Sequence, residues 1–167
     1  MDKALFKLSY GMYVVSSFSE EKINGQIADA VFQVTAEPPK VAAAINKENL
    51  THEMIENSGI FSVSVLEKQT PLDLVRVFGF SSGRNKNKFE KFDYKVMENG
   101  VPILLQNSLA YLVLKISEKL DAGTHTIFVG DVIESNILKE GESMTYDYYR
   151  KIKEGATPKP APTFQSP

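Results

Sequence analysis

The stretch AYLVLKISEKL (Ala110–Leu120), followed by DAGTH (Asp121–His125) and TIFVGDVIESNI (Thr126–Ile137), decides the fold class of this chain. Both long segments are rich in β-branched and aromatic residues, which favour strands. The short segment between them is polar and contains a glycine, which is typical of a turn. The sequence therefore predicts two long strands joined by a tight turn.

The rest of the chain predicts more strands than helices. Leu5, Leu8 and Met12 indicate a short helical entry, and Ser19–Lys22 followed by Asn24-Gly25 indicates a hairpin connection. Pro38-Pro39 ends the segment after that connection. Further strands are expected at about residues 10–15, 26–35, 40–45 and 60–66. Helices are expected at residues 49–59, at 71–78 with Pro71 in the first position, and at 146–153.

Six or more strands, with two or three short helices and no βαβ alternation, indicate a mainly β protein. An antiparallel Greek-key barrel fits this pattern better than a Rossmann sheet. The chain also lacks a Gly-x-Gly-x-x-Gly sequence, so dinucleotide binding through that motif is excluded.

Composition narrows the function classes further. The 167 residues are 43% hydrophobic and 24% charged, which is ordinary for a globular domain, and the net charge is −2. This balance predicts no general attraction to nucleic acid or to an anionic membrane. The chain has no cysteine, which excludes disulfides, cysteine-bound metal centres and thiol catalysis. A redox role would need a bound organic cofactor or a metal site without thiolate ligands.

The N-terminal ten residues carry charges at Asp2, Lys3 and Lys7 and contain no apolar signal-peptide core. No apolar run approaches the roughly 20 residues that span a bilayer. The expected location is the cytoplasm.

Two segments carry groups suited to a nucleotide. Asn24–Val31 has small side chains at Ala28 and Ala30, so a flat ring can lie against the backbone. Asn46–His52 joins a buried strand to a helix start, where free N–H groups and the helix dipole favour an anion. The alternatives are an ordinary hairpin for the first segment and an ordinary capped helix with a solvated His52 for the second.

Two later segments are also candidates. The loop Phe80–Phe89 carries Arg84, Lys86 and Lys88 between aromatic residues that can touch a ring or a phosphate, although most charged loops are only solvated. Gly123–Gly130 places His125 on a tight turn between two strands, where a histidine is more often structural than catalytic.

Taken in order, these segments resemble the flavin reductase-like family, which folds as an FMN-binding split barrel. Within it, the chain is most similar to flavoredoxin-type proteins and to the flavin domain of high-molecular-weight rubredoxins. The resemblance covers roughly Ala4 to Tyr149. It rests on an ordered set of motifs: Asn24-Gly25 before a small-residue strand, Glu37-Pro38-Pro39, Asn46-x-x-Asn49-x-Thr51-His52, Ser58-Gly59-x-Phe61-x-Val63-x-Val65-Leu66, and Gly123-x-His125-Thr-Ile-Phe-Val-Gly-Asp-Val132.

The resemblance implies a set of cofactor-binding residues. One strand would lie along the isoalloxazine edge, a loop and helix start would hold the phosphate, and a basic-aromatic pair would flank the cofactor. In that order, these residues are Gln26, Ile27, Ala28, Asp29 and Ala30; Asn46, Lys47, Asn49, Thr51 and His52; and Lys88 and Phe89. FMN is the expected cofactor, with FAD less favoured, and NADH or NADPH is a candidate substrate.

His125 matches the histidine near the flavin, where reductases of this family place a nicotinamide. It is therefore the candidate catalytic residue, through substrate positioning or a hydrogen bond near the ring. No side chain is assigned to obligatory acid–base chemistry, and no metal site is predicted. The chain departs from the family pattern at Thr124, where many reductases have Asp, and at Asp29, where Ser or Asn is commoner. These departures bear on nicotinamide use more than on flavin binding.

The resemblance implies an FMN-binding redox protein that takes electrons from a nicotinamide or a donor protein. It would pass them to a flavin, a metal centre or a partner protein. One alternative is an electron-transfer flavoprotein without nicotinamide activity, and another is a barrel whose ligand is a haem or a different nucleotide. Because the family members are dimers, a homodimer is expected, with Tyr146, Tyr148 and Tyr149 as interface candidates.

Residues 1–154 are expected to form the flavin-binding domain, and residues 155–167 an extended, mobile, proline-rich tail. The tail resembles the linker before the rubredoxin module of fused relatives. Because this chain has no cysteine, a rubredoxin-like partner would have to be a separate protein.

Overall fold

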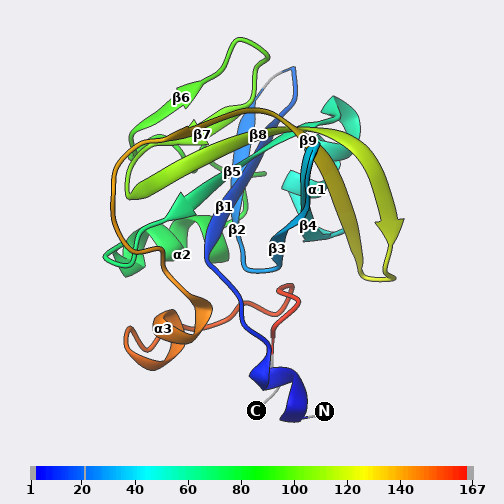
Figure 1. The fold of residues 1–167 in the computed structure, drawn as a ribbon. Helices are drawn as coiled ribbons and strands as arrows, with labels where there is room; N and C mark the ends of the chain where they lie inside the picture. The colour runs from blue at the N-terminus through cyan, green and yellow to red at the C-terminus, as the bar shows by residue number, and fades with distance from the viewer. Residues whose placement is uncertain (1–2, 21, 165–167) are drawn as a thin grey trace.

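The computed structural model describes residues 3–20 and 22–164, and one antiparallel sheet dominates it (Figure 1). Seven strands follow the order β2-β1-β5-β8-β9-β4-β3, and a separate hairpin pairs β6 with β7. The strands are β1 (Tyr13–Phe18), β2 (Ile23–Ala28), β3 (Val31–Ala36), β4 (Pro39–Asn46), β5 (Ile60–Leu66), β6 (Tyr94–Val96), β7 (Pro102–Leu104), β8 (Ser108–Asp121) and β9 (His125–Ile137).

The sheet is curled because its two outer strands are consecutive in the sequence. Strand β2 leads into β3 through only Asp29 and Ala30, so the two outer strands must approach each other there. The N–H of Ala44 in β4 donates to the carbonyl of Ala30 at 3.0 Å. Within the described residues no ladder joins β2 to β3, so the barrel is open along this seam. The predicted mainly β, antiparallel split barrel is confirmed.

The long β8–β9 hairpin forms as the sequence predicts. Its ladder runs from Ala110 opposite Ile137 to Asp121 opposite Thr126, and register shifts after Val113 and Ile116 bend it. Gly123 has a φ of 83°, a left-handed conformation that glycine adopts without strain. This hairpin brings His125 opposite Asn46 in β4.

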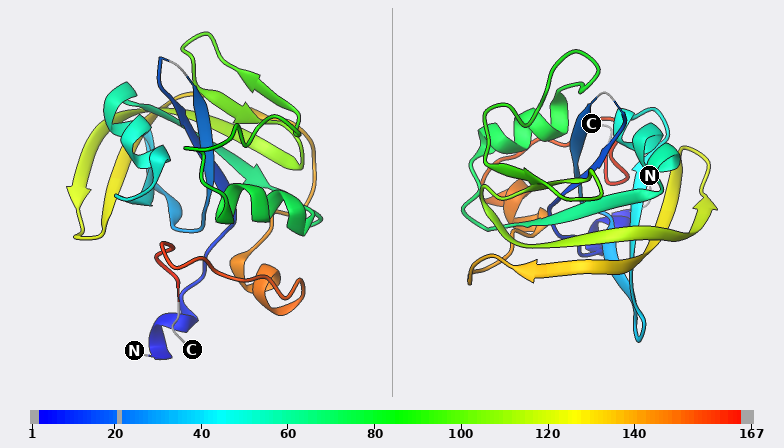
Figure 2. Two further views of the ribbon diagram at one scale, coloured as in Figure 1. Left: turned by 180° about the vertical axis from the view of Figure 1, so that it is seen from behind. Right: turned by 90° about the horizontal axis from the view of Figure 1, so that it is seen from above.

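Three helices and a short 3₁₀ turn, η1 (Lys3–Lys7), complete the fold. Helices α1 (Leu50–Ser58) and α2 (Leu72–Phe80) lie on opposite sides of the β1–β2 hairpin (Figure 2). Gly59 ends α1 with a φ of 70°, as its position in the sequence predicts. Helix α3 (Tyr146–Lys151) is capped by the Thr145 hydroxyl, which accepts from the N–H of Tyr148.

Two main clusters of buried side chains hold these elements together. One fills the barrel and includes Phe61, Phe128 and Ile55 of α1. The other packs α2 and α3 against the β1–β2 hairpin through residues such as Phe78, Phe89 and Tyr149. The pocket described below opens between these two clusters, at the bend between β2 and β3.

The sequence prediction was wrong about Asn24-Gly25, which lie inside β2 and not in a turn. The strand pair β1–β2 turns earlier, where the N–H of Ser19 donates to the carbonyl of Lys22 at 2.8 Å. Gly25 is required for close packing, because a Cβ there would lie 2.7 Å from the Ser16 hydroxyl. The predicted strand at 26–35 is also broken, at Asp29-Ala30, where the chain changes edge.

The hairpin β6–β7 was not predicted, because its strands are only three residues long. It covers the serine side of β5. The Ser62 hydroxyl donates to the carbonyl of Pro102 at 2.5 Å, and the Ser64 hydroxyl accepts from the N–H of Leu104 at 3.0 Å. Helix α2 begins one residue later than expected, with Pro71 at the N-cap, and extends to Phe80.

The tail expected at residues 155–167 is described as far as residue 164, and residues 165–167 lie outside the described residues. Residues 155–164 fold back toward η1 and the barrel, and several of them line the pocket (Figure 1). Within the described parts of the chain, no helix is both long and apolar enough to cross a membrane.

Candidate functional site

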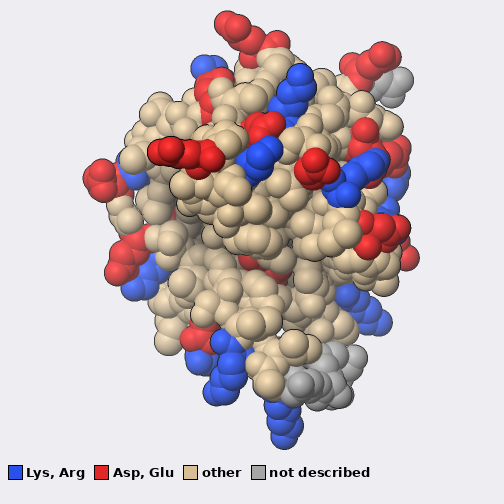
Figure 3. All heavy atoms as spheres, turned by 45° about the vertical axis from the view of Figure 1, so that its right-hand side comes forward, with Lys and Arg blue, Asp and Glu red and all other residues tan. Residues whose placement is uncertain are grey.

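A cavity of about 310 Å³ lies at the bend between β2 and β3. This volume is at the lower end of the roughly 300–1,000 Å³ of small-molecule pockets. Its walls come from β2, the start of α1, the end of α2 with the loop after it, and the tail. Figure 3 shows a face that is hollowed near its centre, with charged side chains gathered mostly around the periphery.

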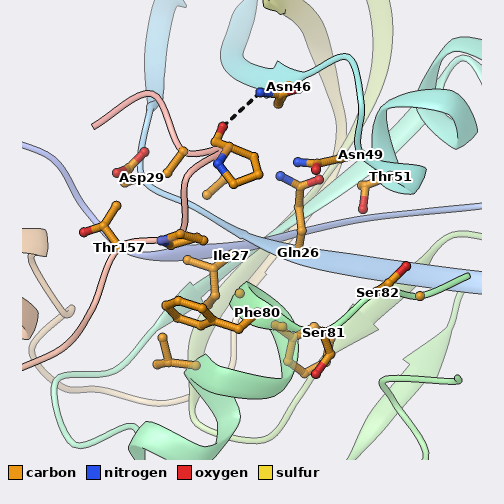
Figure 4. Close-up of a pocket in the computed structure, with 18 of the residues that line it drawn as sticks. Gln26, Ile27, Asp29, Asn46, Asn49, Thr51, Phe80, Ser81, Ser82 and Thr157 are labelled. Carbon is orange, nitrogen blue, oxygen red and sulfur yellow. Dashed lines mark hydrogen bonds between the residues drawn. The ribbon is translucent and has the colours of Figure 1, made fainter. Parts of the chain in front are cut away.

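The start of α1 forms one end of the cavity. The Asn46 side chain accepts from the N–H of Glu48 at 2.9 Å, which turns the chain from β4 toward the helix. Asn49 is the N-cap, but its side chain makes no capping bond and lies beside Gln26 in the cavity wall (Figure 4). Thr51 is fully buried, and its hydroxyl accepts from the Asn24 amide at 2.9 Å. The Thr51 hydroxyl and the helix N-terminus therefore lie at the same end of the cavity.

The loop after α2 brings more polar groups to this end. Ser81, Ser82, Gly83 and Arg84 line the cavity. A Cβ at Gly83 would lie 2.0 Å from the Asn24 amide oxygen, so only glycine allows the loop to approach β2 this closely. The Arg84 guanidinium contacts Glu53 of α1 at 3.2 Å, which ties the loop to the helix.

Lys88 is the buried cation of the cavity. Its side chain is 5% exposed, and its ammonium donates to the carbonyls of Gly25 at 2.9 Å and Phe78 at 3.3 Å. Burial, with a smaller contribution from the nearby charge of Lys86, lowers the pKa of Lys88 to about 8. Burial disfavours the positive charge of Lys88, and an anion bound nearby would stabilise that charge. Anion binding would therefore be favoured here.

Strand β2 forms the long wall of the cavity through Gln26, Ile27, Ala28 and Asp29. Three buried acceptor atoms on and beside this wall have no hydrogen-bond partner among the described residues: Asn24 Oδ1, Gln26 Oε1 and Asp29 Oδ1. Buried acceptors are almost always paired in native structures. The wall is therefore incomplete without a ligand or water that donates hydrogen bonds.

Asp29 is the acidic group of the site, and it is 5% exposed. Burial raises the pKa of Asp29. Three influences oppose that shift: a hydrogen bond from Thr163, the backbone N–H groups of Asp29 and Ala30, and the nearby His125. Asp29 and Thr157 lie at the opposite end of the cavity from Thr51 and Ser82 (Figure 4).

The tail covers the Asp29 end. The carbonyl of Pro160 accepts from the Asn46 amide at 3.2 Å and lies 3.1 Å from Nε2 of His125. The other imidazole nitrogen of His125 lies 2.8 Å from the Thr124 hydroxyl. His125 therefore borders the site through the tail and does not line the cavity itself.

The structure brings together eight of the residues predicted from the sequence: Gln26, Ile27, Ala28, Asp29, Asn46, Asn49, Thr51 and Lys88. Ala30, Lys47, His52, Phe89 and His125 lie outside the cavity lining. Lys47 pairs with Asp121 at 2.7 Å, and Nε2 of His52 contacts the Thr126 hydroxyl at 2.8 Å. The Phe89 ring is fully buried against Phe78, in the core beneath the cavity.

The sequence prediction omitted the lining residues Ser81, Ser82, Tyr146, Tyr149 and those of the tail. The polar glycine-bearing loop after α2 is a usable signal for the two serines. Nothing local in the sequence signals the tail, because its position depends on contacts with residues far away in the chain.

Comparison with known proteins gives a family and relatives that cover nearly the whole chain. Residues 5–156 match the model of the flavin reductase like domain. The chain is 48% identical over 162 residues to a high molecular weight rubredoxin of Moorella thermoacetica, covering 97% of this chain and 71% of that protein. It is 43% identical over 165 residues to a ferric-chelate reductase (NAD(P)H) of Archaeoglobus fulgidus, covering 97% and 96% of the two chains.

Two solved structures resemble the fold at 26% identity. The NADH:FAD oxidoreductase SgcE6 of Streptomyces globisporus, in complex with NAD and FAD fragments, superposes with a TM-score of 0.75 over 86% of this chain and 84% of that one. An FMN-binding protein of Thermus thermophilus superposes with a TM-score of 0.76 over 96% and 92%. The match over residues 5–156, together with the identity to both relatives over nearly the whole chain, shows that this protein belongs to the flavin reductase like domain family.

Proposed function

We propose that this chain binds FMN in the cavity between β2, α1 and the loop after α2, and acts as a flavin-dependent redox protein. The observation that carries the proposal is that the cavity has two chemically different ends, in a member of this family. One end offers a helix N-terminus, hydroxyls and cations, and the other offers unpaired acceptors on a strand of small residues.

The residues present fit a flavin mononucleotide. A phosphate matches the Thr51 hydroxyl, the start of α1, Arg84 and Lys88, because all are donors or positive charges. A flavin ring carries both an N–H donor and carbonyl acceptors on its pyrimidine edge. The unpaired Gln26 Oε1 accepts from such a donor, and the backbone beside Ala28 leaves room for a flat ring.

A bound flavin supplies the redox chemistry, taking up a hydride or electrons from a donor and passing electrons to an acceptor. The protein supplies binding and orientation. Asn49, Thr51 and Lys88 hold the phosphate end, and β2 with Phe80 holds the ring end. His125 and Asn46 act on a nicotinamide donor, through hydrogen bonds to its carboxamide.

The relatives support this assignment and suggest the donors and acceptors. The Archaeoglobus relative is named for NAD(P)H and ferric chelates, and SgcE6 for NADH and FAD. The Thermus protein is named for FMN. We prefer FMN because the cavity is small and its cationic end has a phosphate-sized set of donors.

A second function is favoured by one contact. Nε2 of His125 faces the Pro160 carbonyl, so the group proposed to position a nicotinamide is occupied by the tail. In an electron-carrying flavoprotein without nicotinamide activity, this arrangement would persist. A rubredoxin-like module would then be the partner, which the name of the Moorella relative supports.

We also propose a homodimer, but on a different surface from the tyrosines suggested by the sequence. Tyr149 is 3% exposed and packs within its own chain. Large exposed apolar side chains lie instead on β3 and on the far part of β9: Phe32, Val34, Ile133 and Ile137. Sedimentation should give about twice 18.6 kDa; a monomer that retains flavin would contradict this.

Flavin titration tests the central proposal. At a free FMN concentration about 100 times its dissociation constant, binding should stabilise the fold by roughly 2.7 kcal/mol. For a domain of this size, that raises the melting temperature by about 5–11 °C. FAD and riboflavin are titrated in parallel, and NADH and NADPH oxidation is then measured with the best flavin. The absence of any shift with all three flavins would refute the proposal.

A matched pair of variants tests the phosphate end. Thr51→Ala should weaken FMN far more than riboflavin, which has no phosphate, because a hydrogen bond to a charged group contributes about 1.5–3 kcal/mol. Ser19→Ala, in the exposed turn between β1 and β2, is the control and should change neither affinity. Equal weakening of FMN and riboflavin by Thr51→Ala would place its effect in the fold.

A further inference from the structure

Residues 155–164, here called the strap, are fastened to α3 at their beginning. The N–H of Gly155 donates to the carbonyl of Tyr149 at 3.0 Å, and the Tyr149 hydroxyl donates to the carbonyl of Ala156 at 2.7 Å. The hydroxyls of Tyr146 and Thr157 are also hydrogen-bonded to each other. These contacts direct the strap from α3 across the mouth of the cavity.

The far part of the strap is held by three polar residues of the site. The Pro160 carbonyl faces both the Asn46 amide, at 3.2 Å, and Nε2 of His125, at 3.1 Å. The Thr163 hydroxyl donates to Asp29. Figure 4 shows the bond from Asn46 to the strap, which lies over the end of the cavity where Asp29 is found.

The strap has the chemistry of the ligand that it would exclude. The Pro160 carbonyl is an amide oxygen, like the carboxamide oxygen of nicotinamide, and it occupies two side chains that can donate to such an oxygen. Pro158, Pro160 and Pro162 of the strap also line the cavity. An amide acceptor and a compact ring therefore already occupy this end of the site.

Proline content makes the strap suited to reversible binding. Pro158, Pro160 and Pro162 have no N–H, so these residues leave no donor unpaired when the strap lies on the protein or in water. Their fixed φ angles also lower the entropy lost on docking. A few hydrogen bonds are thus sufficient to hold the strap, and a competing ligand can replace them.

We propose that the strap is an internal competitor of the nicotinamide, and that NADH or NADPH binds only after the Pro160 carbonyl leaves Asn46 and His125. The proposal rests on the proposed function and specifies how that site is regulated. The strap lowers the apparent affinity for the nicotinamide nucleotide in proportion to the time it is closed. The cavity proposed for the flavin, from Gln26 and Ala28 to Thr51 and Lys88, stays open while the strap forms one of its walls.

A single thiol reports the position of the strap, because the natural chain has no cysteine. Ala161→Cys places the thiol on the strap, and Glu98→Cys places a control thiol in the exposed turn between β6 and β7. Each full-length variant is loaded with FMN, and N-ethylmaleimide labelling is timed with and without saturating NAD⁺ or NADP⁺. The strap thiol should react about fivefold faster or more with at least one nucleotide, and the control thiol should not change.

The outcomes separate the two proposals. An unchanged strap thiol with both nucleotides overturns the strap proposal. If the nucleotides still bind to the FMN-loaded protein in that experiment, the proposed function stands without the strap. If FMN itself does not bind the Glu98→Cys control, the proposed function fails.

Kinetics of a strap variant give a second test. Thr163→Val keeps the size of the side chain and removes its bond to Asp29. The KM for NADH or NADPH should fall by about fivefold, which corresponds to the net free energy of one hydrogen bond. The kcat and the FMN dissociation constant should stay unchanged. Ser19→Ala, which removes an exposed hydroxyl of the turn between β1 and β2, is the control. Weaker FMN binding by Thr163→Val, or an unchanged KM, would contradict the proposal.

Discussion

The two ends of the cavity are built by different means. At the α1 end, Thr51 and Lys88 are buried, and their side chains are held by Asn24 and by backbone carbonyls of β2 and α2. At the other end, Asp29, Asn46 and His125 are held by a strap whose residues lie 35 to 134 positions away in the chain. The α1 end is built from a helix and strands, whereas the other end depends on the strap, which has no regular secondary structure.

This difference teaches which part of the site is preformed. Donors fixed by a strand and a helix keep their positions when a ligand leaves, so the α1 end is ready for an anion. The strap end is closed by three polar contacts that a ligand can replace. We therefore expect substitutions at the α1 end to change flavin affinity, and those at the strap end to change the use of a nicotinamide.

The largest effect is expected from Lys88→Met. The loss of one charge-assisted bond to phosphate should weaken FMN by about 1.5–3 kcal/mol, or roughly 10- to 150-fold. Riboflavin should be affected much less. Fluorescence titration measures both ligands, and Lys86→Met, a change at the neighbouring exposed lysine, is the control. If both lysine variants weaken FMN equally, the buried position of Lys88 has no special role.

The pH dependence of FMN binding should show the next largest effect. Burial holds the pKa of Lys88 at about 8 in the free protein, and a bound phosphate would raise it by favouring the charged form. Binding then takes up a proton above pH 8. FMN affinity should be constant from about pH 7 to 8 and then fall by up to about tenfold per pH unit.

The stability of the flavin-free protein should change in the opposite direction. The folded pKa of Lys88 is lower than its value of 10.5 in the unfolded chain, so the unfolded chain binds more protons between about pH 8 and 10.5. The contribution of this group to the free energy of unfolding therefore rises with pH in that range. Lys88→Met should lose both trends. A flat FMN affinity across pH 7–10 would place the phosphate away from Lys88.

The smallest effect on stability and flavin binding is expected from His125→Ala at the strap end. Its ring makes two partly exposed hydrogen bonds, to Thr124 and Pro160, so the melting temperature should fall by no more than about 4 °C. FMN affinity should change by less than about twofold, while flavin reduction by NADH becomes several-fold slower. A large loss of both stability and FMN binding would instead make His125 a structural residue.

Much of the fold could be predicted because its signals are local. The alternation in Ile60–Leu66, the positive-φ glycines at 59 and 123, and the long β8–β9 segments lie where the sequence predicts them. The dipeptide Asn24-Gly25 misled the prediction, because its glycine serves close packing between strands and not a turn. The three-residue strands β6 and β7 are too short to show a period.

The candidate site was predictable in part for the same reason. The residues of β2 and of the α1 start lie on single elements, so their motif also describes their arrangement in space. His125 and Phe89 belong to the same ordered set of family motifs but lie outside the cavity. His125 lies behind the strap, and Phe89 lies in the core. Sequence spacing does not show which side of an element faces a cavity.

By itself, the sequence determined the family, the antiparallel barrel and the absence of thiol chemistry. Only the tertiary structure decided that Lys88 is a buried cation, that three acceptors on the β2 wall lack partners, and that the tail closes over Asp29 and His125. The physical reason is range. Strand period, capping and turn preference act over a few residues, whereas burial and pairing of a polar group depend on which distant segments fold against it.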